Sequence, residues 1–187
     1  MARLTVRDFT GGRKVDASGG GTVLTGLRGG VLVAATIAMG LMAGLFYAYA
    51  CSVMIALGRA DDRTFVDVMQ KINVAILNGW FGLGFGGAAV LSAAAVGLHL
   101  PRDGHAALPW IVAGLVLYVA VLAVTFRVHI PLNDGLVAAG DPGRIPDLAA
   151  VRRHFEGTWV HWNVARAVLC TGALGCLGWA LRVSGRA

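Results

Sequence analysis

Three long stretches of the chain contain no charged residue: 29–58, 72–101 and 104–126. A helix needs about 20 residues to cross the hydrocarbon core of a bilayer. A fourth apolar stretch is long enough only if Arg166 lies inside it. The pattern predicts an all-α membrane protein, a single bundle of four spanning helices. The predicted spans are about 30–57, 77–100, 107–130 and 158–181.

A short amphipathic helix is predicted between the first two spans, over Asp61–Ile76. Its apolar residues follow a helical period, and Asp61 or Asp62 can cap its first turn. Such a helix lies in the membrane interface, where it would cover the mouth of the bundle. The apolar positions are Phe65, Met69, Ile72 and Ile76.

The spans divide the chain into a basic, flexible N-terminal tail (1–28), the membrane domain (29–183) and a short C-terminal tail (184–187). An even number of spans places both ends of the chain on one side of the membrane. The distribution of Lys and Arg favours the cytoplasmic side. We therefore expect an integral protein of a bacterial cytoplasmic membrane, with 59–80, 127–157 and the start of the fourth span gathered on the opposite side.

Composition supports the membrane assignment. The 187 residues are 57% hydrophobic and 14% charged, with a mean hydropathy of +0.70, whereas soluble domains have about 25% charged residues. The net charge of +6 is spread over loops and tails, which suits a bilayer with anionic headgroups and predicts no nucleic-acid partner. Cys51, Cys170 and Cys176 form no CxxC pair, which disfavours a thiol–disulfide oxidoreductase.

Small residues recur at four-residue spacing in the first two spans. Gly40, Gly44 and Ala48 lie in the first, and Gly82 and Gly86 in the second. Small residues at this period allow helix backbones to approach closely. We expect these two helices to pack tightly, and the same glycine-rich faces are where a homo-oligomer would form.

The segment TWVHWNVAR, 158–166, concentrates most of the polar chemistry. In a helix, Trp159, Trp162, Asn163 and Arg166 fall at i, i+3, i+4 and i+7 and share one face. An arginine and an asparagine within hydrocarbon are costly, so both should point into the bundle or a wet cavity. The two indole rings can form the walls of a slot for a flat aromatic molecule, beside which the guanidinium can stack or donate hydrogen bonds.

Other polar residues are predicted at the same end of the bundle. Asp134, at the end of the neighbouring helix, is the expected counter-charge for Arg166. The alternative interpretation is structural: a buried ion pair that holds two helices together, with the tryptophans in an interfacial belt. The remaining members of this group are Gln70, Asn73, Asn78, His129, Asn133 and His161.

Four segments together resemble the anthrone oxygenase-like family of small four-helix membrane proteins. They are GLMAGLFYAYACSVMIALGRAD, VMQKINVAILN, VTFRVHIPLND and WVHWNVAR. The resemblance covers roughly residues 30–182, and PLND together with WxxWNxxR is its more specific part. It implies a link to aromatic polyketide pathways, in which dioxygen oxidises an anthrone methylene to the anthraquinone, although many members have no assigned activity.

A mechanism compatible with the residues and the resemblance begins with a general base, because an anthrone methylene is acidic. His129 or a desolvated Asp134 is the candidate base. Arg166 and Asn163 would stabilise the oxyanion, which makes these four the candidate catalytic residues. The substrate would enter laterally from the bilayer. The expected substrate-binding residues are Gln70, Asn73, Asn78, Asn133, Trp159 and Trp162.

No cofactor is expected for this reaction. The competing hypothesis is iron or copper bound by His129, Asp134, His154 and His161, although no HxxxH or HxxE spacing organises these residues. Haem is disfavoured because no two histidines are placed deep within facing helices. The alternative to an enzyme is a membrane protein that binds a quinone or lipid without turnover, or that stabilises a larger membrane complex.

Overall fold

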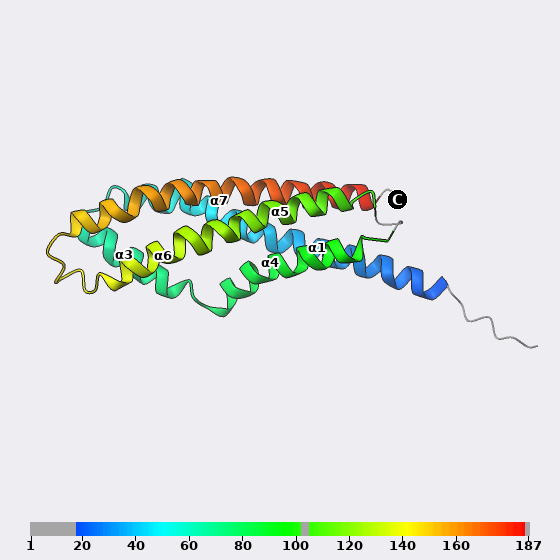
Figure 1. Ribbon diagram of the computed structural model, residues 1–187, viewed down its shortest axis with the longest axis horizontal. Helices are drawn as coiled ribbons and strands as arrows, with labels where there is room; N and C mark the ends of the chain where they lie inside the picture. The colour runs from blue at the N-terminus through cyan, green and yellow to red at the C-terminus, as the bar shows by residue number, and fades with distance from the viewer. Residues whose placement is uncertain (1–17, 102–104, 186–187) are drawn as a thin grey trace, which may run out of the picture.

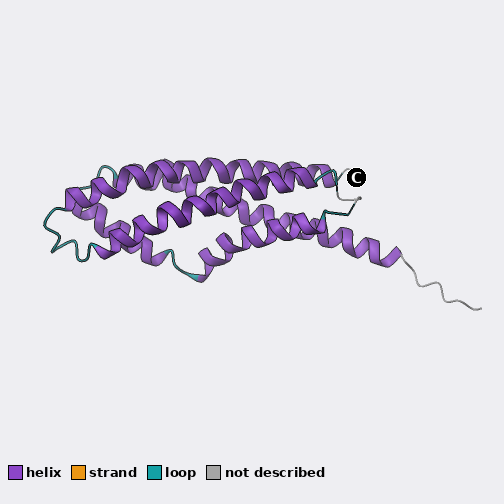
Figure 2. Cartoon of the chain, in the orientation of Figure 1, coloured by secondary structure: helices purple, strands orange, loops and turns teal. Residues whose placement is uncertain are grey.

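The computed structural model describes residues 18–101 and 105–185. Every regular element in these ranges is helical (Figure 2). Two short π-helical turns, η1 and η3, interrupt longer helices. The elements in chain order are α1 (Ser18–Ala48), η1 (Tyr49–Val53), α2 (Met54–Leu57), α3 (Asp62–Ala75), α4 (Gly79–Leu98), α5 (Leu108–Val124), η3 (Thr125–His129), α6 (Ile130–Ala138) and α7 (Leu148–Ser184).

Four long helical stretches run side by side, while α3 and α6 lie together at one end of the bundle (Figure 1). Helices long and apolar enough to cross a membrane extend over Val23–Leu57, Gly79–Leu98, Leu108–Ala138 and Leu148–Ser184. Large apolar side chains such as Leu83 and Val168 are about two-thirds exposed, at 68% and 66%, as a lipid-facing surface requires. The predicted four-helix membrane architecture is confirmed: the chain is an integral membrane protein.

The helix bounds differ from the predicted ones in the first and third spans. α1 begins at Ser18, whereas the first span was predicted from residue 30. The third span continues through Pro131 and ends only at Ala138, because the helix accommodates the proline without ending. The predicted tails fall largely on residues 1–17 and 186–187, which lie outside the described residues.

The η3 turn explains how a helix passes through Pro131. A proline has no N–H to donate, and its ring clashes with the carbonyl four residues earlier in a regular helix. Directly before it, the Ile130 N–H bonds to the Thr125 carbonyl, five residues back. This wider turn relieves the crowding without ending the helix, and π turns of this kind are frequent at functional sites.

The main core lies between α1, α4, α5 and α7 and is rich in alanine and methionine. Its closest approaches involve glycines other than the predicted ones. A Cβ on Gly84 would lie 2.8 Å from Met42 Cε, and a Cβ on Gly114 would lie 3.3 Å from the Leu177 side chain. Gly44, Gly82 and Gly86 have open space around them, so the expected i, i+4 glycine faces do not make the α1–α4 contact.

A second, smaller core joins α3 to the start of α7. Asp61 caps α3 as predicted, accepting hydrogen bonds from the Thr64 N–H and hydroxyl. These bonds lower the pKa of the Asp61 carboxyl. The whole predicted interfacial helix is therefore present, and Phe65 and Met69 on its apolar side are fully buried.

Arg152 of α7 holds the start of α3 in place. Its guanidinium lies 4.5 Å from the centre of the Phe65 ring, and its side chain is 13% exposed. It donates hydrogen bonds to the Gly58 carbonyl (2.9 Å), the Ala60 carbonyl (2.8 Å), the Asp62 carboxylate (3.0 Å) and the Glu156 carboxylate (2.7 Å).

We predict that Arg152→Ala destabilises the protein by about 1–3 kcal/mol, because two carbonyls and two carboxylates lose a charged donor. The measurement is the midpoint of thermal unfolding in detergent. Arg153→Ala is the matched control, since the Arg153 side chain is exposed and should change stability by less than about 0.5 kcal/mol. Equal shifts for the two variants would contradict the prediction.

Candidate functional site

The guanidinium of Arg166 lies inside the bundle, and the residue is 6% exposed. Arg166 Nη2 donates to Asn163 Oδ1 at 3.0 Å, one helical turn earlier in α7. Nη1 contacts the Thr125 hydroxyl of η3 at 3.4 Å. Asn163 in turn donates from Nδ2 to the Phe46 carbonyl of α1 at 3.0 Å. The three long helical stretches of α1, α5–η3–α6 and α7 thus meet around one cation.

Aromatic rings surround this cation. The Arg166 Cζ lies 4.2 Å from the centre of the Phe46 ring and 5.7 Å from that of Trp159. A cation over a ring face is stabilised by the ring quadrupole. Trp159 donates from Nε1 to Asn133 Oδ1 at 3.0 Å, and the His129 ring meets its indole edge-on at 5.2 Å. The aromatic wall is therefore held in a defined orientation.

These groups border a cavity of about 270 Å³, which we call the arginine cavity. Both π turns contribute to it, through Tyr49 from η1 and through Thr125 and His129 from η3. The volume is close to the lower end of the range for small-molecule sites, about 300–1,000 Å³. The other lining residues are Leu45, Phe46, Ile72, Asn73, Ile76, Leu77, Phe81, Phe85, Phe126, Ile130, Asn133, Trp159, Asn163 and Arg166.

Several polar atoms of the arginine cavity have no partner. In the described ranges, five buried side-chain N or O atoms lack a hydrogen bond, and four of these belong to cavity residues. They are Asn73 Nδ2, both ring nitrogens of His129, and Arg166 Nε. A buried polar atom without a partner is costly. The arrangement suits a ligand that brings its own hydrogen-bonding groups.

The expected pairing of Arg166 with Asp134 is wrong. Asp134 is exposed, and no ion pair among described residues includes Arg166. The reason is helical geometry: the helix continues through Pro131, so His129 and Asn133, four residues apart, face inward. Asp134 is rotated by about 100° from Asn133 and points out of the bundle.

Gln70 and Asn78 do not line the cavity. Gln70 Nε2 donates to the carbonyls of Leu136 and Gly140 at 2.8 and 3.0 Å and so binds α3 to the end of α6. Asn78 is exposed and caps α4, accepting from the Phe81 N–H at 3.0 Å. Both side chains bond to helix ends, where unpaired backbone groups are available.

Trp162 also lies outside the cavity. It is 37% exposed, and its ring contacts His161 edge-on at 5.8 Å. The inward face of α7 follows Trp159, Asn163, Arg166 and Cys170. Trp162 and Asn163 lie three and four residues after Trp159, and so on opposite sides of it around the helix. The inward face follows Asn163, which leaves Trp162 at its edge.

The four residues of the metal hypothesis do not meet. His129 is buried in the cavity, whereas Asp134, His154 and His161 are exposed. Within 18–101 and 105–185, no three His, Cys, Asp or Glu side chains lie together in an arrangement that could hold a metal ion. A bound metal would have to use fewer of these side chains or a different donor set.

Phe46, Tyr49, Phe81 and Phe85 are cavity residues that the sequence analysis did not identify. They lie in apolar helices. In such helices the sequence pattern does not distinguish an aromatic residue that faces the bundle from one that faces lipid. The helical spacing of Phe46 and Tyr49 places them on neighbouring faces. Only their proximity to Arg166 distinguishes them.

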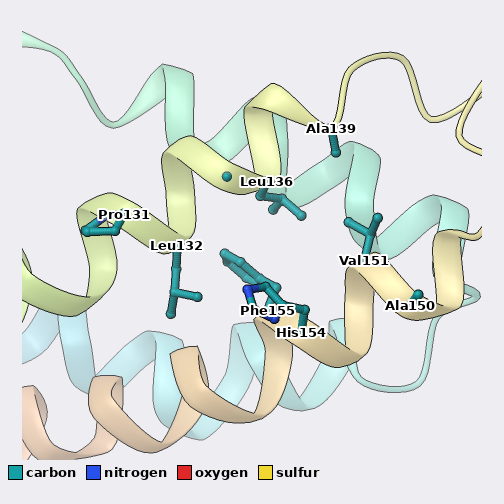
Figure 3. Close-up of a pocket in the computed structure, with 9 residues that line it drawn as sticks. Pro131, Leu132, Leu136, Ala139, Ala150, Val151, His154 and Phe155 are labelled. Atoms are coloured by element: carbon teal, nitrogen blue, oxygen red, sulfur yellow. The ribbon is translucent and has the colours of Figure 1, made fainter.

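A second cavity, of about 440 Å³, lies between α6 and the first turns of α7 (Figure 3). Leu132, Leu136, Val151 and Phe155 contribute apolar side chains, and His154 is its one ionisable lining residue. The stacked rings of Phe155 and Trp159, with centres 6.1 Å apart, lie between this space and the arginine cavity. The second cavity carries none of the unpartnered polar atoms described above.

Fold and site together define a small integral membrane protein with four spanning helices. At one end, its bundle holds a partly open, aromatic-walled cavity lined by the Arg166 guanidinium.

The sequence model of the anthrone oxygenase family matches residues 78–176, which is more than half of the chain. The chain belongs to this family, as the resemblance of its motifs indicated. The matched region contains Thr125, His129, Asn133, Asn163 and Arg166. Phe46, Tyr49 and Asn73 of the cavity lie before it. The search of curated proteins found no match, and neither did the search of solved structures.

We predict that Trp159→Phe costs about 1–3 kcal/mol of stability, because Asn133 Oδ1 loses its donor in a partly buried place. Trp162→Phe, which alters the tryptophan outside the cavity, should change stability by less than about 0.5 kcal/mol. Thermal unfolding of both variants in the same detergent tests this. A larger effect at position 162 would show that the assignment of the inward face is wrong.

Proposed function

We propose that this protein is a membrane-embedded oxygenase that oxidises a flat, electron-rich aromatic substrate of the anthrone or hydroquinone type with dioxygen. Three observations support it: membership of the anthrone oxygenase family, an aromatic-walled cavity of about 270 Å³, and unpartnered polar atoms among the residues that line it. The proposal requires no redox cofactor, because the electrons come from the substrate.

The observation that carries the proposal is the position of His129. Its ring is buried beside Trp159 with both nitrogens unpartnered. A general base must have a free nitrogen directed at the substrate and must not be occupied by a competing donor. His129 lines the arginine cavity, whereas Asp134, the other candidate base, is exposed and does not line it.

In the proposed reaction, His129 accepts a proton from the acidic methylene of the anthrone. The C–H electron pair spreads into the ring system as an enolate. The electron-rich carbon then transfers an electron to dioxygen and forms a C–O bond, which gives a hydroperoxide after protonation. Loss of the second methylene proton with cleavage of the O–O bond leaves the quinone carbonyl and one water molecule.

Arg166 has the role of stabilising the enolate oxygen. Charge that develops near a preorganised cation in a dry site is stabilised more strongly than in water. Asn163 holds the guanidinium through Oδ1 and is itself fixed by the Phe46 carbonyl, so its part is positioning. Trp159 and Phe46 supply flat surfaces against which an aromatic ring can stack.

A lateral route from the bilayer is part of the proposal. Leu77, Phe126 and Ile130 line the arginine cavity and yet are 81%, 61% and 38% exposed. They lie at the α3–α4 corner, at η3 and at the start of α6. An apolar substrate dissolved in lipid could enter between them without crossing a polar surface.

The test is oxidation of anthrone by protein purified in detergent, followed by oxygen consumption and by the absorbance of anthraquinone. We predict that His129→Gln lowers kcat about 10²–10⁴-fold, the usual contribution of a general base. His154→Gln is the matched control, because His154 lines the second cavity, and its activity should equal that of the wild type. Ligand binding by wild-type protein without turnover would favour a non-enzymatic quinone-binding protein instead.

Metal removal gives an independent check. Because the proposed electrons come from the substrate enolate, prolonged treatment with a chelator should leave the oxidation rate unchanged. Elemental analysis of the same sample should find iron and copper far below one equivalent per chain. Loss of activity on chelation, restored by one added metal, would overturn the cofactor-independent form of the proposal.

A further inference from the structure

We propose that the arginine cavity binds its planar ligand as an anion, with an ionised ring oxygen placed against the Arg166 guanidinium. The inference deepens the proposed function and rests on it only for the aromatic skeleton of the ligand. The charge of the ligand follows from the balance of charges around Arg166, which is independent of any oxidation chemistry.

The Arg166 guanidinium lacks an acidic counter-charge. An arginine stays protonated in proteins, and a buried charge needs a partner, because desolvation without one is expensive. Among the residues that the structure describes, no carboxylate forms an ion pair with Arg166. Its hydrogen-bond partners, Asn163 and Thr125, are neutral.

The titratable groups around Arg166 do not supply a negative charge at neutral pH. They are Tyr49 from η1, His129 from η3 and Cys170 from α7. Tyrosine and cysteine side chains are ordinarily neutral at pH 7, and histidine can only add positive charge. The residues that α1, α3 and α4 contribute to the cavity wall are apolar or amide-bearing.

Two buried donors of the cavity residues have no acceptor. Arg166 has Nη1 and Nη2 in use, while Nε is buried and unpartnered. The Asn73 Nδ2 atom, buried on α3 and lining the same cavity, is a second donor without an acceptor. Donors that lack acceptors favour an acceptor-rich ligand, and an ionised oxygen accepts more strongly than a hydroxyl or carbonyl.

Binding should therefore release a proton. A ring hydroxyl or enol enters as the neutral acid from lipid, its O–H bond breaks, and the electron pair remains on the oxygen. The proton passes to the buffer. The ligand class is an aromatic or enolic compound with an acidic ring hydroxyl, and its analogue without this hydroxyl should bind more weakly.

The probe is 2-hydroxyanthraquinone, whose visible absorption moves to longer wavelength when its hydroxyl ionises, compared with anthraquinone, which has no ionisable group. Purified wild-type protein in detergent is titrated with each compound at a pH where the free dye is neutral, with empty micelles as the blank. We expect the bound dye to have the anion spectrum, and anthraquinone to bind at least about 30-fold more weakly than the dye. Calorimetry in two buffers of different ionisation enthalpy should give one proton released per dye bound.

Variants connect the effect to Arg166. Arg166→Gln should bind the dye in its neutral form and roughly 30-fold more weakly, while Arg166→Lys should keep the anion spectrum. Thr125→Asp provides a second variant with Arg166 intact, in which a carboxylate beside Nη1 replaces the ligand as counter-charge, so the anion spectrum should be lost. Trp162→Phe, outside the cavity, should behave as wild type.

A neutral dye spectrum in the wild type, or equal affinity for the two anthraquinones, would overturn the inference. These outcomes are separable from the anthrone assay. Anion binding without any oxidation would reject only the proposed function. Oxidation of anthrone with the dye bound neutral would reject only the anionic ligand.

Discussion

A buried guanidinium without an acidic partner is the constraint on which the functional end of this bundle depends. Arg166 can lie within an apolar helix only because its own helix provides an amide oxygen and the Trp159 ring, and neighbouring helices provide a hydroxyl and the Phe46 ring. Each of these is a weaker substitute for a carboxylate. The cation is therefore held in position while its charge remains uncompensated, which gives an otherwise hydrophobic protein a place to bind a polar group.

The two π turns show how helices with apolar sequences can present polar groups inward. A regular helix through Pro131 would break or kink. The η3 turn lets it continue, and the continuation keeps Thr125, His129 and Asn133 on the cavity side. The η1 turn contributes Tyr49 to the cavity wall, with its ring centre 5.8 Å from that of Trp159. Backbone irregularity in this protein is concentrated where the cavity is.

The bundle differs between its two ends. At the end without the cavity, the Arg28 Nε donates to the Leu98 carbonyl at 2.7 Å, a direct connection between α1 and the last turn of α4. At the other end, α3 lies over the bundle, held by Arg152 and Gln70 rather than by continuity with α4. The corner at residues 76–78 and the exposed Leu77 leave that side less covered. This asymmetry supports entry of a ligand from the lipid beside the corner.

Much of the architecture followed from the sequence alone. Long uncharged intervals require membrane helices whatever their neighbours are, because burying charge in lipid is costly. The parity of four spans places 59–80, 127–157 and the start of the fourth span at one end. The amphipathic period of Asp61–Ile76 predicted α3 with its cap. The inward direction of Arg166 and Asn163 was also predicted, because the other direction would place both polar side chains in lipid.

The tertiary structure decided which polar residues meet. Whether Asp134 or Asn133 faces inward depends on how the helix passes Pro131, and a one-residue rotation exchanges them. Gln70 and Trp162 have side chains suited to a binding site, yet one bonds to the end of α6 and the other lies at the edge of the inward face. Phe46 and Tyr49 became cavity residues through packing that no local pattern encodes. A local sequence pattern predicts which residues of a helix face inward to within about one residue. The composition of a site depends on which residues face inward on several helices at once, and only the tertiary structure decides that.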